Sequence, residues 1–284
     1  MIQRSFVREP RPGDRIRGDV RLPDGAPATT AVVVAHGFKG FKDWGFFPHL
    51  CRRLAAAGHA VVSFNFSRNG IGDDPEVFSE LDRFGTNTYT LELEELLSVL
   101  RETLDGTLLP EAPRRVGLLG HSRGGAQAVL AAAEEPRVAS LVTWAAVSRL
   151  DRWEPSAVEE WRREGRIWVV NGRTGQRMPL YVTLLDDFEA NRGRFDVEEA
   201  ARRVDAPWLV VHGREDETVP FGEAEVLARA GRDAHLRPVE GAGHTFGVGH
   251  PFTTSAPALD QAVKATAAHL DRTLSPGRTP PEAP

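Results

Sequence analysis

The sequence predicts an α/β protein: a doubly wound, mostly parallel sheet with helices on both faces and a cap or lid insertion. Short apolar runs of β-forming residues alternate with helical stretches along most of the chain. These runs are apolar on both faces, as strands covered by helices on both sides must be. Residues 148–204 break the alternation, and we interpret them as an insertion between two strands of the core.

The expected strands coincide with the apolar runs, at residues 31–35, 60–66, 115–120, 140–145, 208–212 and 235–239. Helices are expected where apolar residues recur at helical spacing, at residues 47–57, 88–104, 124–135, 221–230 and 259–274. The opening segment, residues 3–22, is typical of a hairpin, which we expect at the edge of the sheet.

We expect residues 1–147 and 205–274 to form one core and residues 148–204 to form the insertion, which holds Trp153, Trp161 and Trp168. Loops at the carboxyl edge of a doubly wound sheet surround the ligand site. An insertion there would act as a lid or cap. Residues 275–284 are rich in proline, and we expect them to be disordered.

Composition narrows the classes of partner. The 284 residues carry a formal net charge of −5, which gives no electrostatic reason to expect nucleic acid or an acidic membrane surface. No apolar run approaches the roughly 20 residues that span a bilayer, and the N-terminus lacks a secretory signal, so we expect a cytoplasmic protein. The single cysteine, Cys51, excludes an intrachain disulfide and is expected to be a buried helix residue. The oligomeric state stays open, with a homodimer as one option.

A nucleophile is predicted at Ser122, in the pattern Gly120-x-Ser122-x-Gly124. The pattern follows an expected strand and precedes an alanine-rich helix, which is the context of a nucleophile elbow. Glycine two positions on either side relieves the crowding of such a sharp turn. The helix N-terminus behind the serine favours developing negative charge. The alternative is an ordinary glycine-rich turn into a helix.

A serine nucleophile needs a base and an acid that orients the base. In this kind of fold the chain order is serine, acid, histidine. Asp216 follows the expected strand at 208–212 and is the candidate acid, with Glu215 and Glu217 as neighbours that could take the role. His244, in a glycine-flanked loop after the last expected strand, is the candidate base. His250 is the reserve.

The oxyanion of an acyl-transfer reaction needs two N–H donors. We expect one from Arg123, directly after the nucleophile, and one from Phe38, in the loop after the strand at 31–35. Gly37 permits backbone that other residues cannot adopt, and His36 is interpreted as a structural residue that holds the loop.

Other polar and aromatic residues are weaker candidates for contact with the substrate. The loop at 67–74 could contact substrate or form an ordinary turn. Core packing is the default for the nearby aromatic residues, although some are expected to line an acyl or aryl pocket. No metal-ligand spacing and no phosphate-binding loop occurs, so we expect neither a metal nor a cofactor. The aromatic residues are Phe41, Trp44, Phe46 and Phe47.

The motifs together resemble the α/β-hydrolase superfamily over residues of about 30 to 272. Within it the chain looks most like bacterial esterases of the cinnamoyl/feruloyl-esterase, dienelactone-hydrolase-like and serine-aminopeptidase-like groups. The segments that carry the resemblance are His36-Gly37-Phe38, Gly-His-Ser-Arg-Gly-Gly at 120–125, His212-Gly213-x-x-Asp216-x-x-Val219-Pro220 and Gly243-His244.

The resemblance implies an α/β-hydrolase fold and hydrolysis of a carboxylic ester through an acyl-enzyme. It carries over Ser122, Asp216 and His244 as a triad, with Phe38 and Arg123 as oxyanion donors. One position departs from the pattern, because Arg123 is bulky and charged where many relatives have Gln, Met or Leu. We expect its side chain to alter the pocket or to pair with an acid nearby.

We therefore expect a serine hydrolase acting on a small or aryl ester. An amidase or serine peptidase is an alternative, because the same groups cleave both bonds. A small-molecule receptor on this fold is an alternative of another class, which a missing triad residue would indicate, and none is missing. Superfamily membership does not fix the substrate.

Overall fold

The computed structural model describes residues 1–25 and 28–274, so the expected tail at 275–284 lies outside the described residues. An eight-stranded sheet runs in the order β1-β2-β4-β3-β5-β6-β9-β10. From β4 to β10 all neighbours are parallel, which confirms the doubly wound, mostly parallel sheet. Its strands are β1 (Ile2–Arg11), β2 (Asp14–Leu22), β3 (Thr30–Ala35), β4 (Ala60–Asn65), β5 (Arg115–His121), β6 (Val138–Trp144), β9 (Trp208–Gly213) and β10 (Ala234–Val239).

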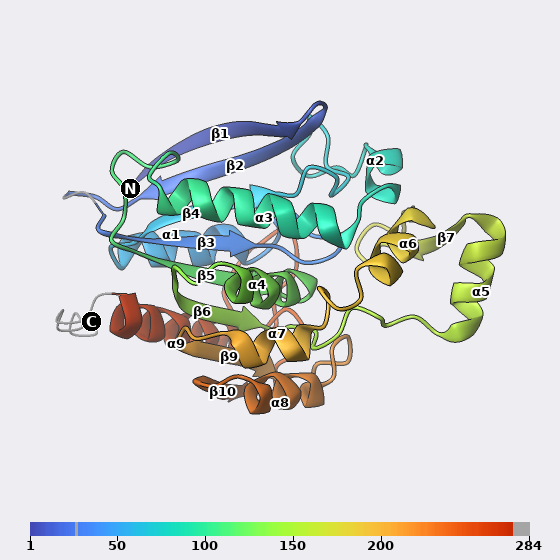
Figure 1. The fold of residues 1–284 in the computed structure, drawn as a ribbon. Helices are drawn as coiled ribbons and strands as arrows, with labels where there is room; N and C mark the ends of the chain where they lie inside the picture. The colour runs from blue at the N-terminus through green and yellow to red at the C-terminus, as the bar shows by residue number, and fades with distance from the viewer. Residues whose placement is uncertain (26–27, 275–284) are drawn as a thin grey trace.

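The hairpin expected at the N-terminus is confirmed. Strands β1 and β2 pair antiparallel, and β2 joins the parallel part of the sheet through an antiparallel pairing with β4. Figure 1 shows this hairpin at one edge of the sheet. Most of β1 is exposed, which suits an edge strand whose outer face has no neighbour.

Helices cover both faces of the sheet, as parallel strands require. In Figure 1, α3, α4, α7 and α8 cover the face toward the viewer, and α1 and α9 lie behind it. Every expected helix is present within one or two residues of its expected ends. The helices outside the insertion are α1 (Phe47–Ala56), α2 (Leu81–Gly85), α3 (Tyr89–Leu104), α4 (Arg123–Glu134), α8 (Phe221–Ala230) and α9 (Pro257–Leu274).

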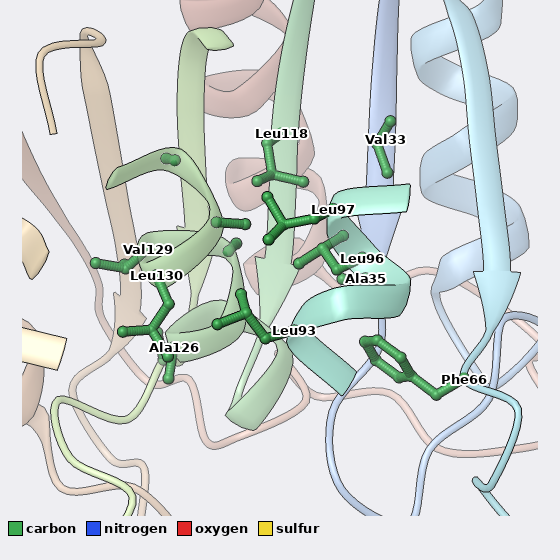
Figure 2. Packing of buried hydrophobic residues seen from close by; sticks show 14 of the residues in the cluster. Val33, Ala35, Phe66, Leu93, Leu96, Leu97, Leu118, Ala126, Val129 and Leu130 are labelled. Carbon is green, nitrogen blue, oxygen red and sulfur yellow. The ribbon is translucent and has the colours of Figure 1, made fainter. Parts of the chain in front are cut away.

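A large cluster of buried apolar residues lies where α3 and α4 meet β3 and β5. Figure 2 shows Leu93, Leu96 and Leu97 of α3 directed at Val33 and Leu118 of the strands. These residues are buried. Burying a leucine contributes about 1.5–3 kcal/mol, so this layer fixes the end of β5 from which the candidate nucleophile projects.

Residues 145–207 connect β6 to its parallel neighbour β9. The sequence patterns predicted no individual helix or strand in this segment. Helix α5 (Pro155–Glu164) precedes an antiparallel pair, β7 (Arg166–Val170) and β8 (Arg177–Tyr181). Helices α6 (Thr183–Ala190) and α7 (Val197–Arg203) follow. In Figure 1, α5, β7 and α6 extend beyond the sheet, whereas α7 lies against α4 and α8.

Candidate active site

Ser122 stands at the turn between β5 and α4, with φ of 56° and ψ of −123°. Such a positive φ is strained for a residue with a side chain and is held by the packing around it. A Cβ at Gly120 would lie 2.2 Å from the carbonyl oxygen of Gly124, and one at Gly124 would lie 2.2 Å from that of His36. Both positions therefore require glycine for the turn to form.

The structure brings Ser122, His244 and Asp216 together. The Nε2 atom of His244 lies 3.1 Å from Ser122 Oγ, and its Nδ1 atom lies 2.8 Å from Asp216 Oδ2. The serine ends β5, the aspartate follows β9 and the histidine follows β10, so neighbouring strand ends supply all three. A hydroxyl, an imidazole and a carboxylate in this chain of hydrogen bonds can activate the serine as a nucleophile.

Asp216 is fully buried and heavily hydrogen-bonded. Its Oδ1 atom accepts from the N–H groups of Thr218 at 2.9 Å and Val219 at 2.8 Å. Burial opposes its charge, but hydrogen bonds from His212, His244 and Val219 outweigh burial and hold the pKa of the carboxyl well below its usual range. Asp216 is therefore an anion throughout the neutral range, whereas its neighbours Glu215 and Glu217 are exposed turn residues.

Two further histidines support the arrangement. His212 Nε2 donates to the carbonyl oxygen of Val219 at 2.8 Å and lies 3.4 Å from Asp216 Oδ2. His121 Nε2 donates to the backbone carbonyl of His244 at 3.0 Å, and the two rings lie 4.8 Å apart. Burial lowers the pKa of His121 to about 3, so this ring stays neutral beside His244.

The loop after β3 places the second expected oxyanion donor. A Cβ at Gly37 would lie 2.9 Å from Ser122 Cβ, so only glycine permits this close approach of the loop to the nucleophile. His36 holds the loop, because its Nδ1 donates to the Gly37 carbonyl at 2.9 Å and its Nε2 accepts from the Phe66 N–H at 3.3 Å. Within the described residues, the N–H groups of Phe38 and Arg123 donate to no protein acceptor.

The side chain of Arg123 is fixed between an acid and an aromatic ring. Its guanidinium donates to Glu92 Oε1 at 2.6 Å, and its Cζ lies 4.2 Å from the centre of the Phe38 ring. Glu92, 5% exposed, also accepts from Asn87 at 2.7 Å. The Phe38 ring also stacks on Phe84. Glu92 is the nearby acid that was expected to pair with Arg123. The Arg123 side chain also packs on Phe38 of the oxyanion loop.

A pocket of about 200 Å³ opens beside Ser122. The four aromatic residues considered for its wall, Phe41, Trp44, Phe46 and Phe47, do not line it; that expectation is wrong. Three of them, all but Trp44, are buried in the core, where they pack against each other and neighbouring rings. The apolar wall comes instead from Tyr89, Leu150, Trp153, Leu180, Leu184 and Val219.

The remaining candidates lie elsewhere. The Nδ1 of His250 accepts from the Gly45 N–H at 3.0 Å, and its ring packs on Phe41 and Trp44, away from Ser122. The loop at 67–74 does not line the pocket and is held by contacts such as Asn69 with the Gly40 carbonyl. Cys51 is buried in α1, and burial raises the pKa of its thiol to about 11.

Within 1–25 and 28–274, no group of three or more His, Cys, Asp or Glu side chains is arranged to hold a metal ion. No helix among these residues has the length and apolar character needed to cross a membrane.

Sequence patterns missed Glu92, His121 and His212 as residues of the site. Glu92 had a weak signal, because it is an acidic residue within the leucine-rich stretch of α3. The two histidines adjoin residues that the motifs singled out, but nothing in the motifs shows where their rings point.

Comparison with known proteins places the chain among hydrolases. The chain is 25% identical over 229 residues to 2,6-dihydropseudooxynicotine hydrolase of Paenarthrobacter nicotinovorans, covering 78% of this chain and 53% of that protein. The chain thus spans about half the length of this relative. The structure resembles Est1E from Butyrivibrio proteoclasticus, with a TM-score of 0.69, 16% identity and coverage of 95% of this chain and 99% of the other.

A second solved structure is dienelactone hydrolase from Anabaena variabilis, with a TM-score of 0.61, 18% identity and coverage of 96% of this chain and 99% of the other. At these identities the two structures establish the fold alone. The model of the alpha/beta hydrolase family matches residues 32–258, most of the chain and every residue of the candidate site. The chain belongs to the alpha/beta hydrolase family.

Proposed function

We propose that the protein is a serine hydrolase that cleaves carboxylic esters through an acyl-enzyme. Ser122 is the nucleophile, His244 the general base and acid, and Asp216 the residue that orients the imidazole. The observation that carries this proposal is the unbroken chain of hydrogen bonds, 2.8 Å from Asp216 to His244 and 3.1 Å from His244 to Ser122, on a strained elbow.

In the first half of the reaction, Ser122 Oγ forms a bond to the ester carbonyl carbon and passes its proton to His244 Nε2. The carbonyl oxygen becomes an oxyanion, which the N–H groups of Phe38 and Arg123 bind. The carbon–oxygen bond to the alcohol then breaks, and His244 returns the proton to the departing alkoxide. A water molecule repeats these steps on the acyl-enzyme and releases the acid.

The ionisation of Asp216 suits its role. An anion beside Nδ1 fixes the tautomer that presents a lone pair on Nε2 to the serine, and it stabilises the imidazolium that forms during the reaction. Replacing the acid in such a triad costs about 10⁴-fold in kcat. Each N–H of the oxyanion site contributes about 10²–10³-fold.

Residues 148–204 form the cap in this proposal. Trp153, Leu180 and Leu184 of this segment line the pocket beside Ser122. The cap also rests on the oxyanion loop, because Lys39 Nζ donates to the Val170 carbonyl of β7 at 2.9 Å. Helix α7 attaches the cap to the core through its packing on α4 and α8.

Ester and amide hydrolysis are separated by assaying p-nitrophenyl acetate, p-nitrophenyl butyrate and leucine p-nitroanilide. We expect turnover of the esters to exceed that of the anilide by orders of magnitude, and turnover of the anilide alone would establish the peptidase alternative. The structure of Est1E holds ferulic acid, so a protein of this fold can bind an aryl carboxylic acid, the kind of product that hydrolysis of an ester releases.

The base is tested with a matched pair of histidine variants. We expect His244→Ala to abolish ester turnover, because no other base reaches Ser122 Oγ among the described residues. His250→Ala removes an imidazole from the same loop region and should keep turnover. The proposal fails if His244→Ala keeps the wild-type rate or if no ester or anilide is hydrolysed.

A further inference from the structure

Among the residues that the structure describes, arginines and no acidic side chain line the pocket beside Ser122. Arg123, Arg149 and Arg152 all contribute to its wall, which is otherwise mostly apolar. A charge that is buried against apolar surface without a partner is costly, because little water is there to solvate it. An arginine that is exposed and unpaired is instead solvated in the free protein and can bind an anion that enters the pocket.

Two of the three arginines have carboxylate partners. Arg123 is 14% exposed and pairs with Glu92 at 2.6 Å. Arg152 donates to Glu223 at 2.7 Å and to the Thr218 carbonyl at 3.0 Å. Their positive charges are thus balanced before any ligand enters.

The third arginine has no such partner. Arg149 is exposed and makes no ion pair or hydrogen bond within the part of the chain that the structure describes. An adjacent hollow of about 640 Å³ is lined by four acidic residues that do not line the pocket of Ser122: Asp151, Asp196, Glu198 and Glu223. Arg149 lines both hollows and stands at their junction.

We propose that the substrate is an ester that carries a carboxylate, and that Arg149 binds this carboxylate while Ser122 attacks the ester. This inference rests on the proposed function. A guanidinium offers two parallel N–H donors that match the two oxygens of a carboxylate. Phe38, Trp153 and Leu184 would hold the carbon chain between the two polar ends.

The test compares esters that differ only in this charge. On the acyl side the pair is p-nitrophenyl hydrogen adipate and the p-nitrophenyl ester of adipic acid monoamide. On the alcohol side the pair is 4-carboxyphenyl butyrate and 4-carbamoylphenyl butyrate. For each pair the measured quantity is the ratio of kcat/KM for the acid to kcat/KM for the amide.

In wild type we expect the acid to be preferred by about tenfold in one pair, the size of a charge-assisted hydrogen bond that is partly exposed. Arg149→Gln should lower this ratio by about tenfold, and Arg149→Lys should restore part of it. Added salt should reduce the preference, because it screens an exposed pair. The control is Arg229→Gln on α8, which removes an exposed arginine outside the pocket and should leave both ratios unchanged.

The inference is overturned if wild type prefers neither acid, or if Arg149→Gln leaves the preference intact. An enzyme that hydrolyses the amide members of both pairs through Ser122 without preferring an acid contradicts only this inference. An enzyme that hydrolyses none of the four esters contradicts the proposed function itself.

Discussion

The elbow and the insertion differ in how their polar groups are held. Around Ser122, the charged groups have little exposure and fixed partners: Asp216 has two backbone donors and two histidines, and Arg123 has Glu92. In the insertion, ion pairs such as Arg162 with Glu189 are exposed to solvent. Buried, satisfied groups are costly to move, whereas exposed pairs contribute about 0–1 kcal/mol.

This difference assigns separate tasks to the two regions. A preorganised site lowers the barrier for any ester that reaches it. A wall made of cap residues decides which esters reach it. Variants of the elbow should therefore slow all substrates alike, and variants of the insertion should change the ranking of substrates.

The largest effect is expected from the triad. Ser122→Ala and His244→Ala should each lower kcat for p-nitrophenyl butyrate by on the order of 10⁶-fold, because the two groups act as a unit. The double variant should then be no slower than either single variant. Losses that multiply in the double variant would show that the two side chains act independently.

The elbow backbone comes next. Gly124→Ala places a Cβ 2.2 Å from the His36 carbonyl oxygen, so the start of α4 and the loop after β3 must move apart. We expect a fall of about 100-fold in kcat for every ester, since a displacement of about 1 Å at a reacting group costs that much. Gly222→Ala on α8 is the control, because its Cβ would meet nothing within 4 Å. A change in substrate ranking by Gly124→Ala would contradict the division of tasks.

Glu92→Gln tests whether the ion pair between Glu92 and Arg123 supports the oxyanion site. Without its carboxylate, the guanidinium no longer holds the Phe38 ring, and we expect kcat to fall about tenfold for all esters, with KM little changed; losing an oxyanion donor completely would cost more. Thermal unfolding should show a loss of about 3 kcal/mol, because a buried charge is left unpaired. Glu225→Gln, an exposed residue of α8, should show neither effect. An unchanged kcat would show that Glu92 does not support the oxyanion site.

Leu184→Ala tests the insertion. This residue of α6 lines the pocket, so its loss should lower kcat/KM for p-nitrophenyl hexanoate about tenfold more than for p-nitrophenyl acetate. Leu236→Ala on β10, away from the pocket, should leave the ratio unchanged. Equal losses for both esters would indicate that the insertion acts on the chemistry and not on selection.

The smallest effect on turnover is expected from a change at Glu95, a buried acid of the core. Its effect on the pH dependence of stability should be clear. Burial raises the pKa of Glu95 to about 7, although the N–H and hydroxyl of Ser67 bond its two oxygens. In the unfolded chain the Glu95 carboxyl loses its proton near pH 4.5, whereas in the folded protein it keeps the proton up to about pH 7. The free energy of unfolding should therefore fall by at most about 3 kcal/mol as the pH rises from about 4.5 to about 7.

Glu95→Gln should remove this part of the pH dependence, measured by denaturant unfolding at several pH values. In the insertion, Glu189→Gln breaks an exposed pair and should change stability by less than about 1 kcal/mol at every pH. A similar pH dependence in wild type and Glu95→Gln would place the titrating group elsewhere.

Sequence patterns predicted the core and the candidate site better than the insertion. Buried strands such as β3 and β5 are apolar throughout, and glycines at 120 and 124 mark a turn that only glycine permits, so local chemistry fixes both. Among the described residues, strands β7 and β8 pair only with each other, and neither was expected, because residues 148–204 show no clear alternation of strand and helix patterns. The aromatic residues at 41–47 could not be assigned to core or pocket, because that depends on packing between distant segments.

The central claim is that Ser122 is the nucleophile, and covalent labelling tests it most directly. Wild type and Ser122→Ala are treated with a fluorophosphonate, digested, and analysed by mass spectrometry. We expect one labelled peptide in wild type, with the probe on Ser122, and no label in Ser122→Ala. Wild type that resists the probe, or label that persists at another residue in Ser122→Ala, would contradict this claim.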